Sequence, residues 1–176
     1  MRALLTFALL PVTLTAQEPL PLTALPPDTA IIIGARPSKI IASSAWKQLV
    51  AAEQKANPTL AIDVTDAKNV DEIVVAVPGT ALRSRVVMLV RADCKGELAS
   101  RLCLRSRERR GVELSTACLP GGITVLGDPE SLKSVQAGAR NPGPAKALLA
   151  SAEEVRGSND VWIVTNASVD QLAKAN

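Results

Sequence analysis

The chain contains no histidine and no tyrosine, and aromatic residues make up only 2% of its 176 residues. Without histidine, it has no Ser-His-Asp or Cys-His catalytic arrangement and no histidine general base. Without tyrosine, one alternative proton donor is missing as well. The three aromatic residues, Phe7, Trp46 and Trp162, are too few for the stacking surface that usually binds single-stranded nucleic acid. The composition therefore disfavours histidine-based enzymes and nucleic-acid partners.

Cysteine is also scarce, with Cys94, Cys103 and Cys118 as its only three occurrences. Cys94 and Cys103 fall in one predicted helix, where nine residues rise about 13 Å, which is too far for a disulfide. If one disulfide forms, Cys118 is therefore expected to pair with Cys94 or Cys103. The alternative is that all three are small buried apolar residues. With an unpaired thiol left over, a redox role is a third hypothesis. The spacing does not fit a zinc site, no glycine-rich phosphate loop is present, and no cofactor is expected.

The N-terminus has the order of a secretory signal peptide. Met1-Arg2 is positive, residues 3–10 are apolar, and Ala16 is a small residue at a predicted cleavage site. The apolar run is shorter than the roughly 20 residues that span a membrane. A buried N-terminal helix is the alternative, but Pro11 and the prolines that follow argue against it. We expect residues 1–16 to be removed and the chain to be exported, to the periplasm or outside the cell.

The remaining 160 or so residues are enough for one domain with its own core. Residues 17–29 are rich in proline and predict an extended arm, and residues 30–176 predict a single domain. No later segment is apolar enough to cross a membrane. The formal charge is +3, which requires no anionic partner. The partner is left unknown, with another envelope or extracellular protein as the candidate class.

Short β-branched runs and capping residues predict the order β-α-β-β-α-β, followed by β-α-α-β-α. The first helix begins at Pro37, extends to about residue 57, and carries an apolar stripe at Ile41, Ala45, Leu49 and Ala52. The predicted strands are 30–34, 72–77, 85–90, 112–118, 123–127 and 161–164, and the other predicted helices begin near Asp93, Asp128, Ala145 and Ser168.

This pattern predicts an α+β fold with an antiparallel sheet and helices on one face. The first six elements follow the ferredoxin-like, split β-α-β order. Residues 30–118 and 122–176 share landmarks, such as a strand that ends in Gly34 or Gly127 and leads into a helix with proline in its first turn. These matches suggest a duplicated half whose second copy is incomplete, so that the chain is a fragment or a shortened relative of a longer protein.

A family resemblance rests on three segments. Residues 85–90 with the predicted helix that contains Cys94 and Cys103, GITVLGDPESLKSV at 122–135, and SNDVWIV at 158–164 resemble uncharacterised secreted bacterial proteins with ferredoxin-like repeats. The resemblance covers about residues 30–165 as a pattern of elements. It implies fold and export, and no activity.

One catalytic pattern needs consideration. Ser44 and Lys47 form the Ser-x-x-Lys spacing of serine β-lactamases and penicillin-binding enzymes. Those enzymes also need Ser-Asp-Asn and Lys-Thr-Gly elements. Here residues 158–160 have the wrong order, and no Lys-Thr-Gly occurs. A serine hydrolase is therefore the runner-up, and two polar residues on a solvated helix face are the simpler interpretation.

Two clusters of charged residues are further candidates for a binding site. Asp63, Asp66, Asp71 and Glu72 provide oxygen ligands but lack the spacing of a calcium loop. An arginine run could face an anionic surface or simply solvate a helix end, balanced by Glu108. Its members are Arg101, Arg105, Arg107, Arg109 and Arg110. The sequence thus favours an exported, non-enzymatic binding or interaction module.

Overall fold

The computed structural model describes residues 18–57, 67–79, 86–91, 114–137 and 142–166. Within these residues, the chain forms a six-stranded antiparallel sheet with the strand order β4-β5-β3-β2-β1-β6. The strands are β1 (Thr29–Ala35), β2 (Ile73–Pro78), β3 (Val87–Arg91), β4 (Ser115–Leu119), β5 (Ile123–Gly127) and β6 (Val161–Thr165). The predicted α+β fold with an antiparallel sheet is confirmed.

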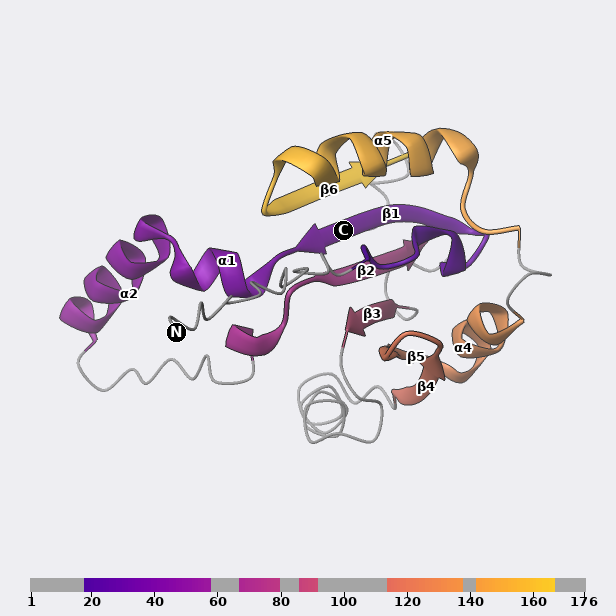
Figure 1. Ribbon diagram of the computed structural model, residues 1–176, viewed down its shortest axis with the longest axis horizontal. Coiled ribbons are helices and arrows are strands. Elements are labelled where there is room, and N and C mark those ends of the chain that lie inside the picture. Colours follow the sequence, from indigo (N-terminus) through magenta and orange to yellow (C-terminus); the bar gives the residue numbers. More distant parts are fainter. Residues whose placement is uncertain (1–17, 58–66, 80–85, 92–113, 138–141, 167–176) are drawn as a thin grey trace, which may run out of the picture.

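Two helices cover one face of the sheet. The helix α4 (Pro129–Gln136) lies against β4 and β5, and α5 (Lys146–Ser158) lies against β6 and β1 (Figure 1). Asp128 caps α4 as predicted, because its side chain accepts hydrogen bonds from the N–H groups of Glu130 and Ser131. Proline at the first position of α4 has no N–H to lose, so it begins the helix without cost.

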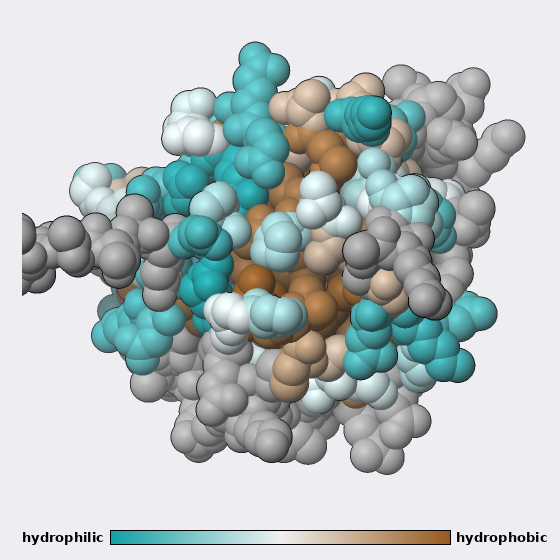
Figure 2. Space-filling model, turned by 45° about the vertical axis from the view of Figure 1, so that its right-hand side comes forward, coloured by the Kyte–Doolittle hydropathy of each residue, from teal (hydrophilic) through white to brown (hydrophobic). Residues whose placement is uncertain are grey.

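The predicted proline-rich arm forms part of the core. Leu20, Leu22 and Leu25 are at most 2% exposed, and they pack in one cluster with the inner face of the sheet and with α4 and α5. A short 3-10 helix, η1 (Leu22–Ala24), turns the arm over the sheet. Figure 2 shows hydrophobic surface near the centre of one face of the molecule, bordered by hydrophilic side chains. The packed domain therefore begins before residue 30.

The single helix predicted from Pro37 to about residue 57 is wrong. Two helices, α1 (Pro37–Ala42) and α2 (Ser44–Ala56), meet at Ser43, which has an extended backbone with φ −68° and ψ 152°. The Ser43 hydroxyl donates to the Ile40 carbonyl and accepts from the Trp46 N–H, so it ends one helix and caps the next.

The apolar stripe predicted on this segment is not buried either. No residue of α2 is buried, and Leu49 is 54% exposed. The helix points away from the sheet and contacts α1 (Figure 1). Because the helix breaks at Ser43, the chain changes direction there. The apolar residues predicted to form one stripe therefore lie on two helices, and those on α2 do not face the core.

The strand pairing also departs from the ferredoxin-like scheme. A split β-α-β unit places another strand between the two that a helix connects. Here β1 and β2, connected through α1 and α2, pair directly, with Ile33 opposite Val75. The ferredoxin-like description thus does not fit the order of strands, and the helix predicted near Asp93, which the ferredoxin-like order of elements also needs, lies outside the described residues. If residues 122–176 repeated residues 30–118, β5 and β6 would correspond to β1 and β2. However, β1 and β2 pair with each other, whereas β5 and β6 do not. The duplication stays a prediction.

Candidate functional site

An open hollow of about 600 Å³ lies where the arm meets the ends of β1, β2 and β3 and the end of α5. Charged residues flank these strands: Arg36 directly follows β1, and Asp71 and Glu72 directly precede β2. Charged side chains therefore gather at the hollow. The lining residues are Glu18, Pro19, Arg36, Ser38, Lys39, Asp71, Glu72, Arg91 and Gly157.

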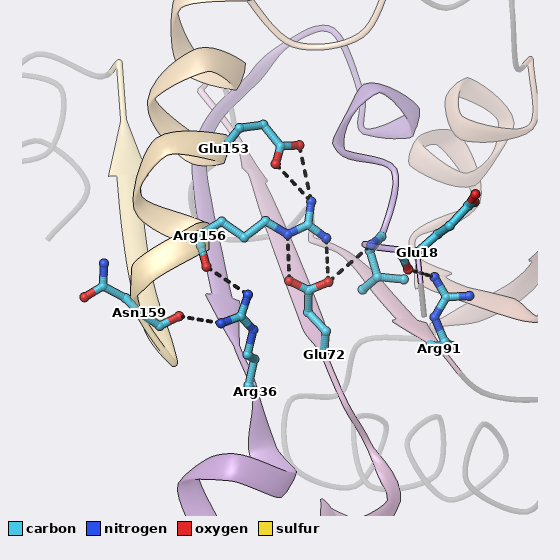
Figure 3. A network of polar contacts seen from close by, with 8 residues as sticks. Glu18, Arg36, Glu72, Arg91, Glu153, Arg156 and Asn159 are labelled. Carbon is cyan, nitrogen blue, oxygen red and sulfur yellow. Dashed lines mark hydrogen bonds and ion pairs between the residues drawn. The ribbon is translucent and has the colours of Figure 1, made fainter. Parts of the chain in front are cut away.

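Glu72, which lines the hollow, forms a buried ion pair with Arg156 (Figure 3). Arg156 Nε donates to Glu72 Oε1 at 2.7 Å, and Nη2 donates to Oε2 at 2.5 Å. The Leu20 N–H donates to Oε2 at 3.2 Å, and Glu153 on α5 accepts from Arg156 Nη1 at 3.3 Å. The two-point geometry is the strongest form of arginine–carboxylate contact, and here it joins the arm, β2 and α5.

These contacts determine the ionisation of both groups. Burial by itself would raise the pKa of Glu72, but hydrogen bonds from Arg156 and Leu20, with the charges of Arg156 and Arg36, hold it below its ordinary value of 4.5. Burial would lower the pKa of Arg156, but the hydrogen bond and charge of Glu72, with those of Glu153, raise it. Both groups are therefore charged at neutral pH, so Glu72 has no proton to donate there.

Two other arginines are held mainly by backbone carbonyls. Arg36 donates to the carbonyls of Arg156 and Asn159, at 2.9 and 3.5 Å, and lies 3.8 Å from an Asp160 carboxylate oxygen. Arg91 donates to the Gly121 carbonyl at 3.0 Å and to the carbonyl of Glu18. These bonds attach the ends of β1 and β3 to neighbouring segments, so the guanidinium groups act as structural ties.

The chemistry available to the hollow is limited. Among the described residues that line it, the most buried carboxylate, Glu72, is neutralised by Arg156. Within the same residues, no group of three or more His, Cys, Asp or Glu side chains could hold a metal ion. Asp71 and Glu72 are adjacent, but Glu72 serves the ion pair, while Asp63 and Asp66 lie outside the described residues. The hollow is therefore a surface depression whose arginines and Glu72 take part in contacts that hold the fold together.

The predicted catalytic pair has no comparable setting. Ser44 and Lys47 occupy the first turn of α2, and both are exposed. Neither lines the hollow, and no hydrogen bond joins their side chains in the described part of the chain. Their position agrees with two polar residues on a solvated helix face.

Several predicted residues cannot be placed. Cys118 lies on β4, but Cys94 and Cys103 are outside the described residues, so the disulfide pairing stays a prediction. The arginine run, Arg101, Arg105, Arg107, Arg109 and Arg110, is outside them too.

Sequence reasoning missed Arg156 and the role of Glu72. A signal existed for both. Arg156 follows Leu148 and Ala152 at intervals of four residues, which places a charged side chain on the buried stripe of α5. Glu72 continues the inward alternation of Val74 and Ala76. A charged side chain on a buried face needs an oppositely charged partner, and Glu72 and Arg156 are each other's partner.

A second candidate surface is the edge of the sheet at β6. This strand ends the strand order and pairs with β1 alone among the described strands. Val161 is 57% exposed and Ile163 64% exposed, on the face opposite the helices. Their cross-strand neighbours on β1, Ala35 and Ile33, are partly exposed as well. Among the described residues, Val161 and Ile163 thus place exposed apolar side chains on the terminal strand of the sheet, which is the position from which strand addition extends a sheet.

Comparison with known proteins gives no further assignment. No protein-family model, curated protein or solved structure matches the chain. In the described residues, no helix has the length and apolar character needed to span a membrane.

Proposed function

We propose that this protein is an exported, non-enzymatic binding module that holds an extended segment of another polypeptide against β6, the terminal strand among the described residues. The observation that carries the proposal is the exposure of Val161 and Ile163 on the terminal strand of the sheet. In strand addition, main-chain hydrogen bonds provide affinity and alternate side chains provide specificity.

The charge distribution favours this edge over the hollow. No residue of β6 is charged, and the strand contains no proline, although natural edge strands are commonly protected by such residues. In the hollow, by contrast, the arginines and Glu72 are already bonded to other parts of the chain. A peptide at β6 would therefore meet no charged side chain of that strand, whereas a ligand in the hollow would compete with existing contacts.

The export part of the proposal rests on the charge and apolar pattern of residues 1–16. A cut after Ala16 makes Leu20 the fourth residue of the mature chain, where its side chain is buried and its N–H donates to Glu72. The mature N-terminus would then be held against the core. Fractionation of cells, followed by determination of the N-terminal residue, tests this part.

A photo-crosslinking amino acid at position 163 tests the binding surface, with position 154 on α5 as the matched control, because Glu154 is exposed on a helix of the same domain. In cells that make the protein, we expect a defined covalent adduct from position 163 and none from position 154. The adduct should disappear when Val161 is changed to Lys. Equal labelling at both positions, or no adduct at position 163, would reject β6 as the binding surface.

A further inference from the structure

We infer, on the basis of the proposed export, that removal of the signal peptide and docking of the arm exclude each other. The bond after Ala16 is cut only while the arm is away from the core, and a precursor whose arm has docked keeps its signal peptide. Residues 18–25 are then a strap whose docking fixes the order of maturation: cleavage comes first, and the arm closes over the sheet afterwards.

The arm is fixed to the body of the domain from its first described residue. The Glu18 carbonyl accepts a hydrogen bond from the Arg91 guanidinium, which also donates to the Gly121 carbonyl at 3.0 Å (Figure 3). Two residues later, the Leu20 N–H donates to the Glu72 carboxylate at 3.2 Å. Both bonds use backbone groups of the arm, so they hold the main chain itself in place.

The predicted cut lies next to these anchors. Only Gln17 separates the bond after Ala16 from Glu18, and one residue spans at most about 3.6 Å. The bond therefore lies within about 7 Å of the Glu18 carbonyl, whatever conformation Gln17 has. A protease must hold the chain on both sides of the bond that it cuts, and a backbone that is already hydrogen-bonded and buried a few residues away resists this.

Undocking the arm exposes deeply buried side chains. Leu20, Leu22 and Leu25 are at most 2% exposed and belong to the main core cluster. The arm also packs closely against the segment between α4 and α5, because a Cβ at Gly143 would lie 2.9 Å from the Thr23 carbonyl oxygen. When a protease acts on a locally opened form, the rate of cleavage is proportional to the population of that form. Docking should therefore slow the cut strongly.

The contacts that dock the arm come from segments far along the chain. Leu20 bonds to Glu72, which is paired with Arg156 on α5, the last described helix. These segments are made and exported after the arm, and contacts between distant parts of a chain form only once the loop between them has closed. The bond after Ala16 is therefore accessible while the chain is exported, and it becomes protected when the domain has folded.

Cleavage of the full chain by purified signal peptidase in detergent tests the inference. A synthetic peptide of residues 1–24 contains the same cut but no domain, so it gives the rate for an undocked arm. We expect the folded precursor, residues 1–176, to be cut at least about 100-fold more slowly than the peptide. Equal rates for the folded precursor and the peptide would overturn the inference.

Two variants of neighbouring residues on β3 separate release of the arm from general instability. Arg91→Met removes the bond to the Glu18 carbonyl and should speed cleavage of the folded precursor about tenfold. Val90→Ala is the matched control, because Val90 is buried in a separate cluster with Val70 and Leu126. It should lower the overall stability and leave the cleavage rate within about twofold of wild type, because the arm opens locally.

Circular dichroism of both variants shows that they are folded under the conditions of cleavage. Equal acceleration by the two would mean that the whole domain has to unfold before the cut, which would also overturn the inference. The peptide distinguishes this inference from the proposed export. A peptide that is not cut after Ala16 removes the signal peptide itself, whereas a peptide cut as fast as the folded precursor leaves export in place and removes only the order of maturation.

Discussion

Glu72 and Arg156 are 84 positions apart in the sequence, yet they form a two-point ion pair with N···O distances of 2.7 and 2.5 Å. Arg156 is 3% exposed and Glu72 8%. The pair connects the beginning of β2 with the last turn of α5, and the Leu20 N–H attaches the arm to the same carboxylate. A single charged contact thus holds three segments of the domain together.

Removal of one partner should be costly. In Arg156→Met, the Glu72 carboxylate remains buried without its cation, and we expect the free energy of unfolding to fall by about 3 kcal/mol. The double variant Glu72→Leu with Arg156→Met should recover part of this loss, because no unpaired charge remains. Urea unfolding at pH 7 measures both. A double variant less stable than Arg156→Met would contradict this account.

The lowered pKa of Glu72 predicts an acid-dependent stability. Its pKa is lower in the folded than in the unfolded chain, so its contribution is present above about pH 4.5 and is lost as the pH falls through the folded-state pKa. Glu72→Gln should therefore be less stable than wild type at pH 7, and the difference should shrink toward pH 3. Glu154→Gln, at an exposed position of α5, serves as the control. A difference that stays constant from pH 7 to pH 3 would speak against the ion pair.

The arm should contribute to stability as a core element. Leu20 is 1% exposed, so Leu20→Ala should lower the free energy of unfolding by about 2–4 kcal/mol. Leu49→Ala, at an exposed position on α2, should change it by less than about 0.5 kcal/mol. Thermal or urea unfolding of the two variants compares them directly. Similar effects would mean that the arm does not belong to the packed domain.

Close packing between β1 and β6 makes Gly34 sensitive to substitution. A Cβ at this position would lie 2.0 Å from Cε2 of Trp162, its cross-strand neighbour. Gly34→Ala should therefore lower the free energy of unfolding by about 1–3 kcal/mol. The same substitution should lower it less in a Trp162→Leu background, where the indole ring is absent. Gly157→Ala is the matched control in α5, where an added Cβ meets no atom within 4 Å. There alanine should stabilise the helix by roughly 0.5–1 kcal/mol.

A disulfide of Cys118 with Cys94 or Cys103 remains the prediction for the exported protein. Peptide mapping under non-reducing conditions should recover Cys118 linked to one of the two and leave the other as a thiol. Three free thiols in the folded, exported protein would favour the alternative of small buried apolar residues.

The local structure could largely be predicted from the sequence, because its causes are local. The run Ile31-Ile32-Ile33 favours a strand, and Asp128-Pro129 starts α4, through properties of the residues themselves. The helix break was missed because Ser43 also fits a helix interior, and its two hydrogen bonds decide the end only once the turn has formed. The buried arm was missed because prolines mark extended chain without showing what covers it.

The sequence by itself determined the strands, the starts of α4 and α5, the apolar alternation of the sheet and the lack of histidine chemistry. Only the tertiary structure decided that β1 lies between β2 and β6, that Glu72 meets Arg156, and that β6 ends the sheet with Val161 and Ile163 exposed. The reason is physical. Propensity, capping and periodicity act within a few residues, whereas strand order and buried charge pairs depend on segments that meet only when the chain folds.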